Sequence, residues 1–142
     1  MPFADILHEE LDMRSQYRFA ISAFALAAIA SGAALAGADD YVFEPVHVDV
    51  KRDDPVVAVR LIHKPSGKPV PDAIIIRTRI DMAPDNMADM ESPLTPVQST
   101  EPGVYAFRTE LTMSGRWLLS IAAKVQGEPE TVIGKVTFRA SR

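Results

Sequence analysis

Short segments in which apolar and polar residues alternate recur between residues 45 and 140, and turn-forming residues separate them. In residues 56–63, for example, Val57, Val59 and Leu61 share one face and Arg60 lies on the other. A two-residue period is typical of strands that bury one face, whereas prolines and glycines between such segments favour turns. No part of this region keeps a helical period. The pattern therefore predicts an all-β domain.

Seven such segments are present, at residues 45–51, 56–63, 73–82, 92–99, 103–111, 117–125 and 130–140. Their length and spacing predict an immunoglobulin-like antiparallel β-sandwich. A small closed barrel is the alternative fold. The segment at 92–99 contains two prolines, which cannot donate to a ladder, so it is expected at an edge. The segment at 73–82 is expected to bury one face, formed by Ile74, Ile76, Ile80 and Met82.

The domain is preceded by a stretch without charged residues, at 19–36, which follows Arg14 and Arg18. A basic start, an apolar stretch and an A-x-A ending, here residues 34–36, are typical of a secretory signal peptide. We therefore expect residues 1–38 to form a signal peptide and residues 39–142 to form a periplasmic β-sandwich domain. An uncleaved membrane anchor is the alternative, although a span usually needs about 20 apolar residues. Because the first twelve residues are acidic, we expect the working start at Met13.

Composition and motifs exclude several classes of function. The chain has no cysteine, so an exported domain would be held together without disulfides. From residue 37 onward it has 13 Lys and Arg against 15 Asp and Glu, a net charge of −2, which does not favour nucleic acid. Neither a Gly-x-Ser-x-Gly nor a His-Glu-x-x-His motif occurs, and no phosphate-binding loop is present. We expect neither an enzyme nor a nucleic-acid partner, and membrane contact only through an uncleaved leader.

Three of the six methionines, Met82, Met87 and Met90, fall in the polar segment at residues 81–90. Thioether sulfur is a soft ligand that selects Cu(I), and it suits an exported protein because free thiols are hard to keep reduced there. Pro84 and Asn86 are expected to curl the segment into a loop that points the sulfur atoms inward. The aspartates between the methionines are expected to favour a cation. The segment therefore predicts a Cu(I) site.

Three further residues are candidate ligands. Met113 is expected at the same end of the sandwich as Met82, His47 on the polar face of the first predicted strand, and His63 at the end of the second. Cu(I) accepts two or three ligands, so the histidines either complete the site or remain ordinary surface residues. The alternative for the methionines is a structural role in the core or beneath a loop. The predicted metal ligands are Met82, Met87, Met90, Met113, His47 and His63.

Three stretches, at residues 57–82, 81–90 and 101–125, resemble the FixH-like/YtkA-like family of exported proteins. The most specific match is the pattern formed by Gly103, Tyr105, Met113, Gly115 and Trp117. The resemblance implies an immunoglobulin-like domain outside the cytoplasmic membrane that is linked to copper handling. It also implies that the methionines are the ligands, that Tyr105 and Trp117 are structural, and that Gly103 and Gly115 need unusual backbone angles.

Two functions follow as expectations. The first is a periplasmic copper chaperone that captures Cu(I) through thioethers and delivers it to an acceptor protein of the envelope, such as an oxidase assembly factor or a transporter. Such delivery would serve oxidase assembly or copper tolerance. The alternative is a metal-free accessory module of an envelope complex that uses the methionine-rich segment for docking, because methionine adapts to varied partners.

Overall fold

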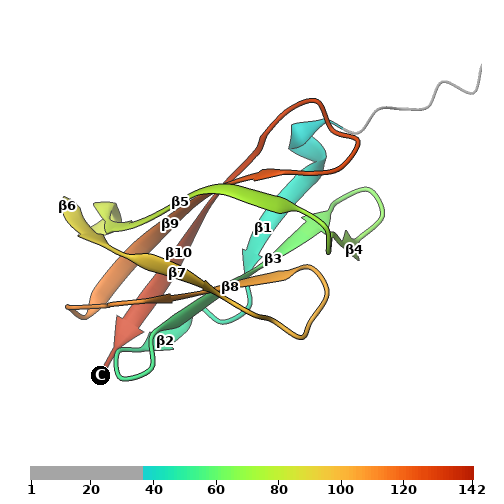
Figure 1. The fold of residues 1–142 in the computed structure, drawn as a ribbon. Coiled ribbons are helices and arrows are strands. Elements are labelled where there is room, and N and C mark those ends of the chain that lie inside the picture. Colours follow the sequence, from blue (N-terminus) through green and yellow to red (C-terminus); the bar gives the residue numbers. More distant parts are fainter. Residues whose placement is uncertain (1–36) are drawn as a thin grey trace, which may run out of the picture. The chain divides into compact units, whose positions relative to one another are not determined.

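The computed structural model describes residues 37–142, which form two β-sheets packed face to face (Figure 1). The first sheet has the order β1-β3-β8-β7 with β4 added on β3, and its strands are β1 (Tyr41–Pro45), β3 (Val56–His63), β4 (Lys68–Pro69), β7 (Leu94–Val97) and β8 (Val104–Thr109). The second has the order β2-β10-β9-β5-β6, and its strands are β2 (Asp49–Lys51), β5 (Ile74–Met82), β6 (Met87–Ser92), β9 (Gly115–Lys124) and β10 (Val132–Ser141). Two single 3-10 turns, η2 (Ala38–Asp40) and η3 (Ala83–Asp85), complete the described elements.

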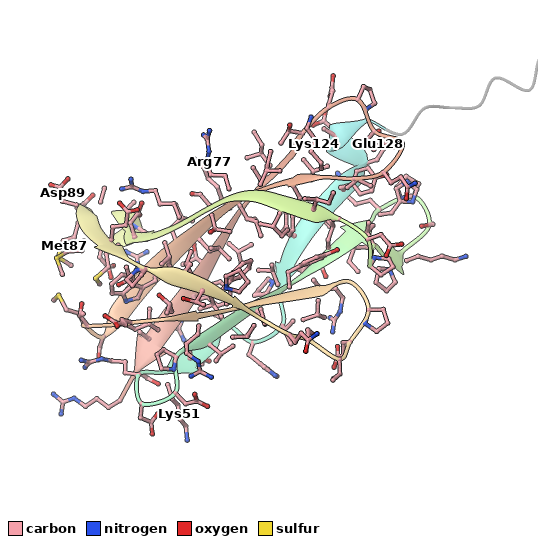
Figure 2. All side chains as sticks on the ribbon, viewed as in Figure 1. Lys51, Arg77, Met87, Asp89, Lys124 and Glu128 are labelled. Carbon is pink, nitrogen blue, oxygen red and sulfur yellow. The ribbon has the colours of Figure 1, made fainter. Side chains whose placement is uncertain are left out.

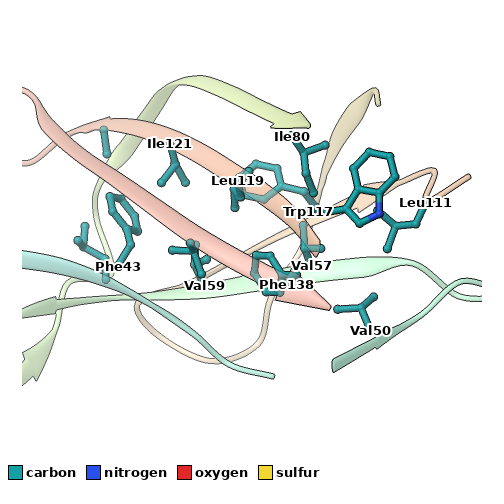
Figure 3. Packing of buried hydrophobic residues seen from close by; sticks show 14 of the residues in the cluster. Phe43, Val50, Val57, Val59, Ile80, Leu111, Trp117, Leu119, Ile121 and Phe138 are labelled. Atoms are coloured by element: carbon teal, nitrogen blue, oxygen red, sulfur yellow. The ribbon is translucent and has the colours of Figure 1, made fainter. Parts of the chain in front are cut away.

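The core lies between the two sheets, as the period-2 pattern requires. Val57, Val59 and Leu61 of β3 face Trp117 and Phe138 of the second sheet, and all five side chains are fully buried. Figure 3 shows side chains from both sheets meeting in this layer. The predicted immunoglobulin-like all-β sandwich is therefore confirmed, with two separate sheets rather than a closed barrel.

The strand count and the first predicted strand were wrong. Residues 37–142 form ten strands, and the predicted strand at 45–51 is divided between the end of β1 and the whole of β2, which lie in different sheets. The Val46 N–H still donates to Ala58 O of β3, whereas Val48 O accepts from Arg139 N of β10. The chain therefore crosses between the sheets at residues 46–48. Because of this crossing β2 pairs with β10 in parallel, an exception to the predicted antiparallel pairing.

A bulge in β5 changes which isoleucines are buried. The register with β9 shifts between Ile75 and Arg77, so Ile75 lies opposite the buried Ala123. An extra residue in a strand reverses the inside-outside alternation on one side of the bulge. Ile80 and Met82 are therefore buried as predicted, but Ile74 and Ile76 are 67% and 53% exposed. The prediction of one continuous apolar face was wrong for these two residues.

Tyr105 and Gly103 fix the connection that leads into β5, as the family resemblance implied. The Tyr105 hydroxyl donates to Val70 O at 2.7 Å and accepts from Ala73 N at 3.0 Å. Gly103 has φ +80°, and a Cβ there would lie 2.5 Å from Cβ of Pro69. Only glycine fits this conformation and this close approach.

The predicted leader falls almost entirely on residues 1–36, which lie outside the described residues. Within residues 37–142, no helix has the length and apolar character needed to cross a membrane.

Candidate functional site

The methionine-rich segment forms a tight turn followed by an edge strand, and not the curled loop that was predicted. Pro84 is the second residue of the 3-10 turn η3, and Asn86 adopts a left-handed conformation with φ 59° and donates its N–H to Ala83 O. Asparagine tolerates this conformation better than most residues. The turn reverses the chain, so that Met87 begins β6, which pairs with β5.

The hairpin places Met87 directly across from Met82. These two are register partners, and the next pair is Asp81 with Glu91. Residues 88–90 therefore bulge out of the edge strand. Met82 is fully buried, Met87 is half-buried against the same core, and Met90 is 37% exposed. The hairpin thus presents one methionine in the core, one at its margin and one in solvent.

Gly115 brings the start of β9 against this hairpin. Its φ is +139°, and an added Cβ would lie 2.8 Å from Cε of Met82 and 2.6 Å from Oδ2 of Asp85. The Met82 methyl group therefore covers a backbone position that tolerates no side chain. Since Gly115 is only two residues after Met113, the same contact brings the loop that carries Met113 close to Met82.

Side chains from three other parts of the chain hold that loop in place. The Trp117 indole N–H donates to Met113 O at 3.2 Å, and the hydroxyl of Ser92, at the end of β6, donates to Glu110 O. Arg52 donates to the carbonyl oxygens of Leu111 and Thr112 at 2.9 and 2.6 Å. The backbone at residues 110–113 is therefore fixed, whereas the Met113 side chain is 40% exposed.

Four methionines, Met82, Met87, Met90 and Met113, thus belong to one end of the domain, which we call the methionine end. The sulfur atoms visible in Figure 2 gather at this end, where Met87 and Asp89 are labelled. The predicted placement of Met113 at the end where β5 finishes agrees with this arrangement. Met82 lies in the core beneath the others, which agrees with its predicted place on the buried face of residues 73–82.

The aspartates of the segment do not form an open anionic site as expected. Asp81 is buried, and its carboxylate accepts hydrogen bonds from Arg79 Nε at 2.7 Å and Ala83 N at 2.9 Å. Asp85 accepts from Arg116 N at 2.7 Å and from Arg116 Nε at 2.8 Å. Asp81 and Asp85 are thus each paired with an arginine, and among the described residues of this segment only Asp89 is exposed without an ion pair. The two aspartates therefore brace the hairpin and add little attraction for a cation.

These hydrogen bonds also change the acidity of both groups. Burial by itself would raise the pKa of Asp81, but the hydrogen bonds from Arg79 and Ala83 and the nearby positive charges hold it below its usual value. The hydrogen bonds from the Arg116 backbone and side chain lower the pKa of Asp85. A carboxylate with a depressed folded-state pKa stabilises the fold above its unfolded pKa of about 3.9, and this contribution disappears as the pH falls through the folded value.

We predict that Asp81→Asn reduces the acid sensitivity of the domain. The wild-type free energy of unfolding should fall as the pH drops from about 5 toward 2, because protonation of Asp81 breaks its pairing with Arg79. The variant should start less stable at pH 7 and lose less on acidification. Urea denaturation across this pH range checks the result, with Asp89→Asn, an exposed position on the same hairpin, as control. Equal acid slopes for Asp81→Asn and the wild type would contradict the assigned role.

His63 lies at the opposite end of the sandwich from the methionines. It ends β3, whose first residue Val56 pairs with Arg108 near the methionine end. Its Nδ1 is 2.7 Å from the Ser66 hydroxyl, and its ring packs against Tyr41 with centroids 5.2 Å apart. His63 therefore braces a turn and is not part of the methionine end.

His47 is also separate from the methionines. It lies two residues before β2, at the edge of the second sheet opposite to β6, with β10, β9 and β5 in between. It is exposed and lines a shallow surface pocket with Asp49 and Asp54. Within residues 37–142, no group of three or more His, Asp or Glu side chains is close enough to hold a metal ion. The six predicted ligands therefore do not form one site, and the donors that share a location are thioethers.

Two residues at the methionine end, Arg52 and Arg116, were missed in the sequence. Arg52 is half-buried and fixes the loop before Met113. Arg116 and Asp85 form an ion pair of 2.8 Å that joins η3 to β9. The only signal for Arg116 is its position between Gly115 and Trp117, inside the most specific part of the family pattern.

Comparisons with known proteins add a family and two structural likenesses. A filamin domain of Lin-41 is 15% identical with a TM-score of 0.42, covering 70% of this chain and 92% of that one. The C-terminal domain of ZirS is 12% identical with a TM-score of 0.44, and the match covers 86% of this chain and 80% of that one. A comparison with curated proteins gave no match. A family model described as YtkA-like matches residues 35–122, a range that includes Met82, Met87, Met90, Met113 and Trp117, and it leaves the FixH part of the predicted resemblance untested. The chain belongs to the YtkA-like family.

Proposed function

We propose that the methionine end binds Cu(I) through thioethers and that the protein delivers this ion to an acceptor in the cell envelope. Membership in the YtkA-like family is consistent with a copper-related periplasmic domain. The observation that carries the proposal is the convergence of Met87, Met113 and the buried Met82 at one end of the sandwich, with Met90 on the same hairpin.

The donor set at this end fits Cu(I) better than other biological metals. Thioethers are neutral and soft, and they select Cu(I), whereas Ca²⁺ and Mg²⁺ need oxygen ligands. Of the carboxylates on this hairpin, Asp81, Glu91 and Asp85 are engaged with Arg79 and Arg116, and Asp89 is a single exposed carboxylate. Hard cations therefore find no free oxygen cluster on this hairpin, and a soft monovalent ion finds sulfur.

Accessibility divides the four methionines into two roles. Met87, Met90 and Met113 are at least partly exposed, so an ion can reach them without opening the core. Met82 has no exposed surface, and its methyl group is packed over Gly115. We assign capture of the ion to Met87, Met90 and Met113, and we assign to Met82 the support of Met87 from below.

This arrangement suits transfer better than storage. The ligands lie on an edge strand and a surface loop, so an acceptor can approach and replace them one at a time. Met90 lies in the bulge at residues 88–90, where the strand is not in register with β5. We propose that Met90 leaves the ion first, while Met113, whose backbone is fixed by Trp117, keeps its place.

We predict that Cu(I) raises the melting temperature of the protein. A ligand that binds only the folded state adds about 2.7 kcal/mol when it is present at 100 times its dissociation constant. The measurement is a thermal melt with and without Cu(I) under reducing, oxygen-free conditions, with Zn²⁺ as a metal control. An unchanged melting temperature in excess Cu(I) would contradict the proposal and favour the metal-free docking module.

A further inference from the structure

We propose that the outer face of the second sheet, around its three exposed isoleucines, binds an anionic lipid surface. Six exposed side chains form this face, which we call the outer patch: Ile74, Ile76, Arg77, Lys124, Ile133 and Lys135. The proposal goes beyond copper binding, because none of these residues belongs to the methionine end.

The strand register places these residues side by side on one face. Arg77 of β5 and Ile133 of β10 both lie opposite Ala122 of β9, and Ile74 lies opposite Lys124. In the next row, Lys135 lies opposite Ser120. The intervening residues of these strands, such as Ala123, are buried, so the six side chains point away from the core. Figure 2 shows Arg77 projecting away from β5.

The patch is apolar at its centre to a degree that is unusual for a surface. Ile133 is 72% exposed, Ile74 is 67% exposed and Ile76 is 53% exposed. The β5 bulge causes the exposure of Ile74 and Ile76, because it turns their side chains from the core to the outside. Grouped exposed apolar residues of this kind mark binding surfaces for proteins or membranes.

The charge of the patch selects an anionic partner. Arg77, Lys124 and Lys135 surround the isoleucines, and no carboxylate of residues 37–142 forms a salt bridge with them. The rest of the domain is acidic, since residues 37–142 together carry a net charge of −2. Cations beside aliphatic side chains match a bilayer interface, where phosphate groups lie next to hydrocarbon.

The path of the chain places the start of β1 at the end of the domain where β9 finishes with Lys124. Tyr41 at the start of β1 donates its hydroxyl to Glu128, in the connection between β9 and β10, at 3.0 Å. The Phe43 ring packs on the core side of Gly134, so β1 lies on the other side of β10 from the outward-pointing Ile133 and Lys135. The described chain therefore starts at the end of the domain that carries the connection between β9 and β10.

Lipid binding by this patch would orient the copper site. Figure 2 shows Lys124 and Met87 toward opposite ends of the domain. A domain held by the outer patch would leave Met87, Met90 and Met113 at the end away from Lys124, to the side of the lipid contact and open to an acceptor.

The test mixes the full chain, purified as the cell processes it, with lipid vesicles and measures how much protein floats with them in a density gradient. We expect the protein to float with vesicles that contain phosphatidylglycerol and not with phosphatidylcholine alone. The triple variant Arg77→Gln, Lys124→Gln, Lys135→Gln should bind roughly 100-fold more weakly, because each cation near an anionic surface contributes about fivefold. A control with the same change in charge replaces three cations outside the patch, Lys51, Lys64 and Lys68, with glutamine and should bind within a fewfold of the wild type.

A second variant separates the apolar contribution from charge. Ile74→Ser with Ile133→Ser alters only exposed side chains, so the fold is retained, and flotation should weaken without any change in charge. Equal flotation of the patch variants and the wild type would overturn the proposal, as would failure of the wild type to float. An acidic protein that binds the wild type but not the patch variants, in the absence of flotation, would overturn it in favour of a protein partner. Cu(I) binding should be unchanged in every patch variant, so this test is independent of the copper proposal.

Discussion

Replacing Met87, Met90 and Met113 together with leucine is expected to abolish Cu(I) binding while leaving the fold intact. The loss of affinity should exceed about 100-fold, since removal of even an outer partner of a metal ligand costs 10- to 100-fold. Leucine has nearly the volume of methionine and lacks the sulfur donor, so the stability change should stay below about 1.5 kcal/mol per site. Competition with a chromophoric Cu(I) chelator measures the affinity, and circular dichroism reports the fold.

The matched control for this experiment is Met82→Leu. It makes the same chemical change one strand away, at a residue with no exposed surface. Cu(I) affinity should remain within a fewfold of wild type if Met82 only supports Met87. Undiminished binding in the triple variant would reject the assigned ligands, and a complete loss in Met82→Leu would move the site into the core.

Gly115→Ala is expected to destabilise the domain by about 2–4 kcal/mol, from a strained backbone at positive φ together with overpacking. The new methyl group would lie 2.8 Å from Cε of Met82 and 2.6 Å from Oδ2 of Asp85. Both side chains would have to move, which would loosen η3 and the hairpin that carries Met87. Chemical denaturation measures the loss, and the Cu(I) affinity of the variant should fall with it.

Gly67→Ala provides the control for backbone strain alone. Gly67 also has a positive φ, +67°, but a Cβ there would meet no atom within 4 Å. Its cost should be about 1–2 kcal/mol, the penalty of a left-handed conformation for a residue with a side chain. If Gly115→Ala proved no more costly than Gly67→Ala, close packing of Met82 against β9 would not hold the methionine end together.

The sequence pattern predicted the strands that bury one regular face. β3, β8, β9 and β10 fall where alternation placed them, because aliphatic or aromatic residues recur at every second, inward-facing position. The positive φ of Gly103 and Gly115 and the burial of Trp117 were also predicted, since the family pattern has residues there with distinctive backbone or packing needs.

The errors share a physical cause, which is that register depends on partners distant in the sequence. Nothing local marks the bulge at Ile76 that exposes Ile74, because all three residues from 74 to 76 are isoleucine. Pro84 and Asn86 indicated an irregular loop, but they form only the turn, and the following residues still pair with β5 as β6.

The candidate site was predictable in its residue types more than in its geometry. The spacing of Met82, Met87 and Met90 suggested a shared site, and the hairpin places the first two across from each other. The alternation of residues 73–82 predicted that Met82 is buried, whereas its spacing from Met87 and Met90 made it a candidate ligand, and the sequence alone did not decide between the two roles. The arginines that neutralise Asp81 and Asp85 also escaped notice, because Arg116 is 31 residues away from Asp85.

The most direct test is nuclear magnetic resonance of ¹³C-labelled methionine methyl groups in the full chain during titration with Cu(I). Side chains whose sulfur joins the ion must change their methyl shifts together and reach a plateau at the same metal ratio. We predict this behaviour for Met87, Met90 and Met113, with a smaller shift for Met82 beneath them and unchanged rings at His47 and His63. Methyl signals at the methionine end that stay in place while Cu(I) is bound elsewhere, or not at all, would contradict it.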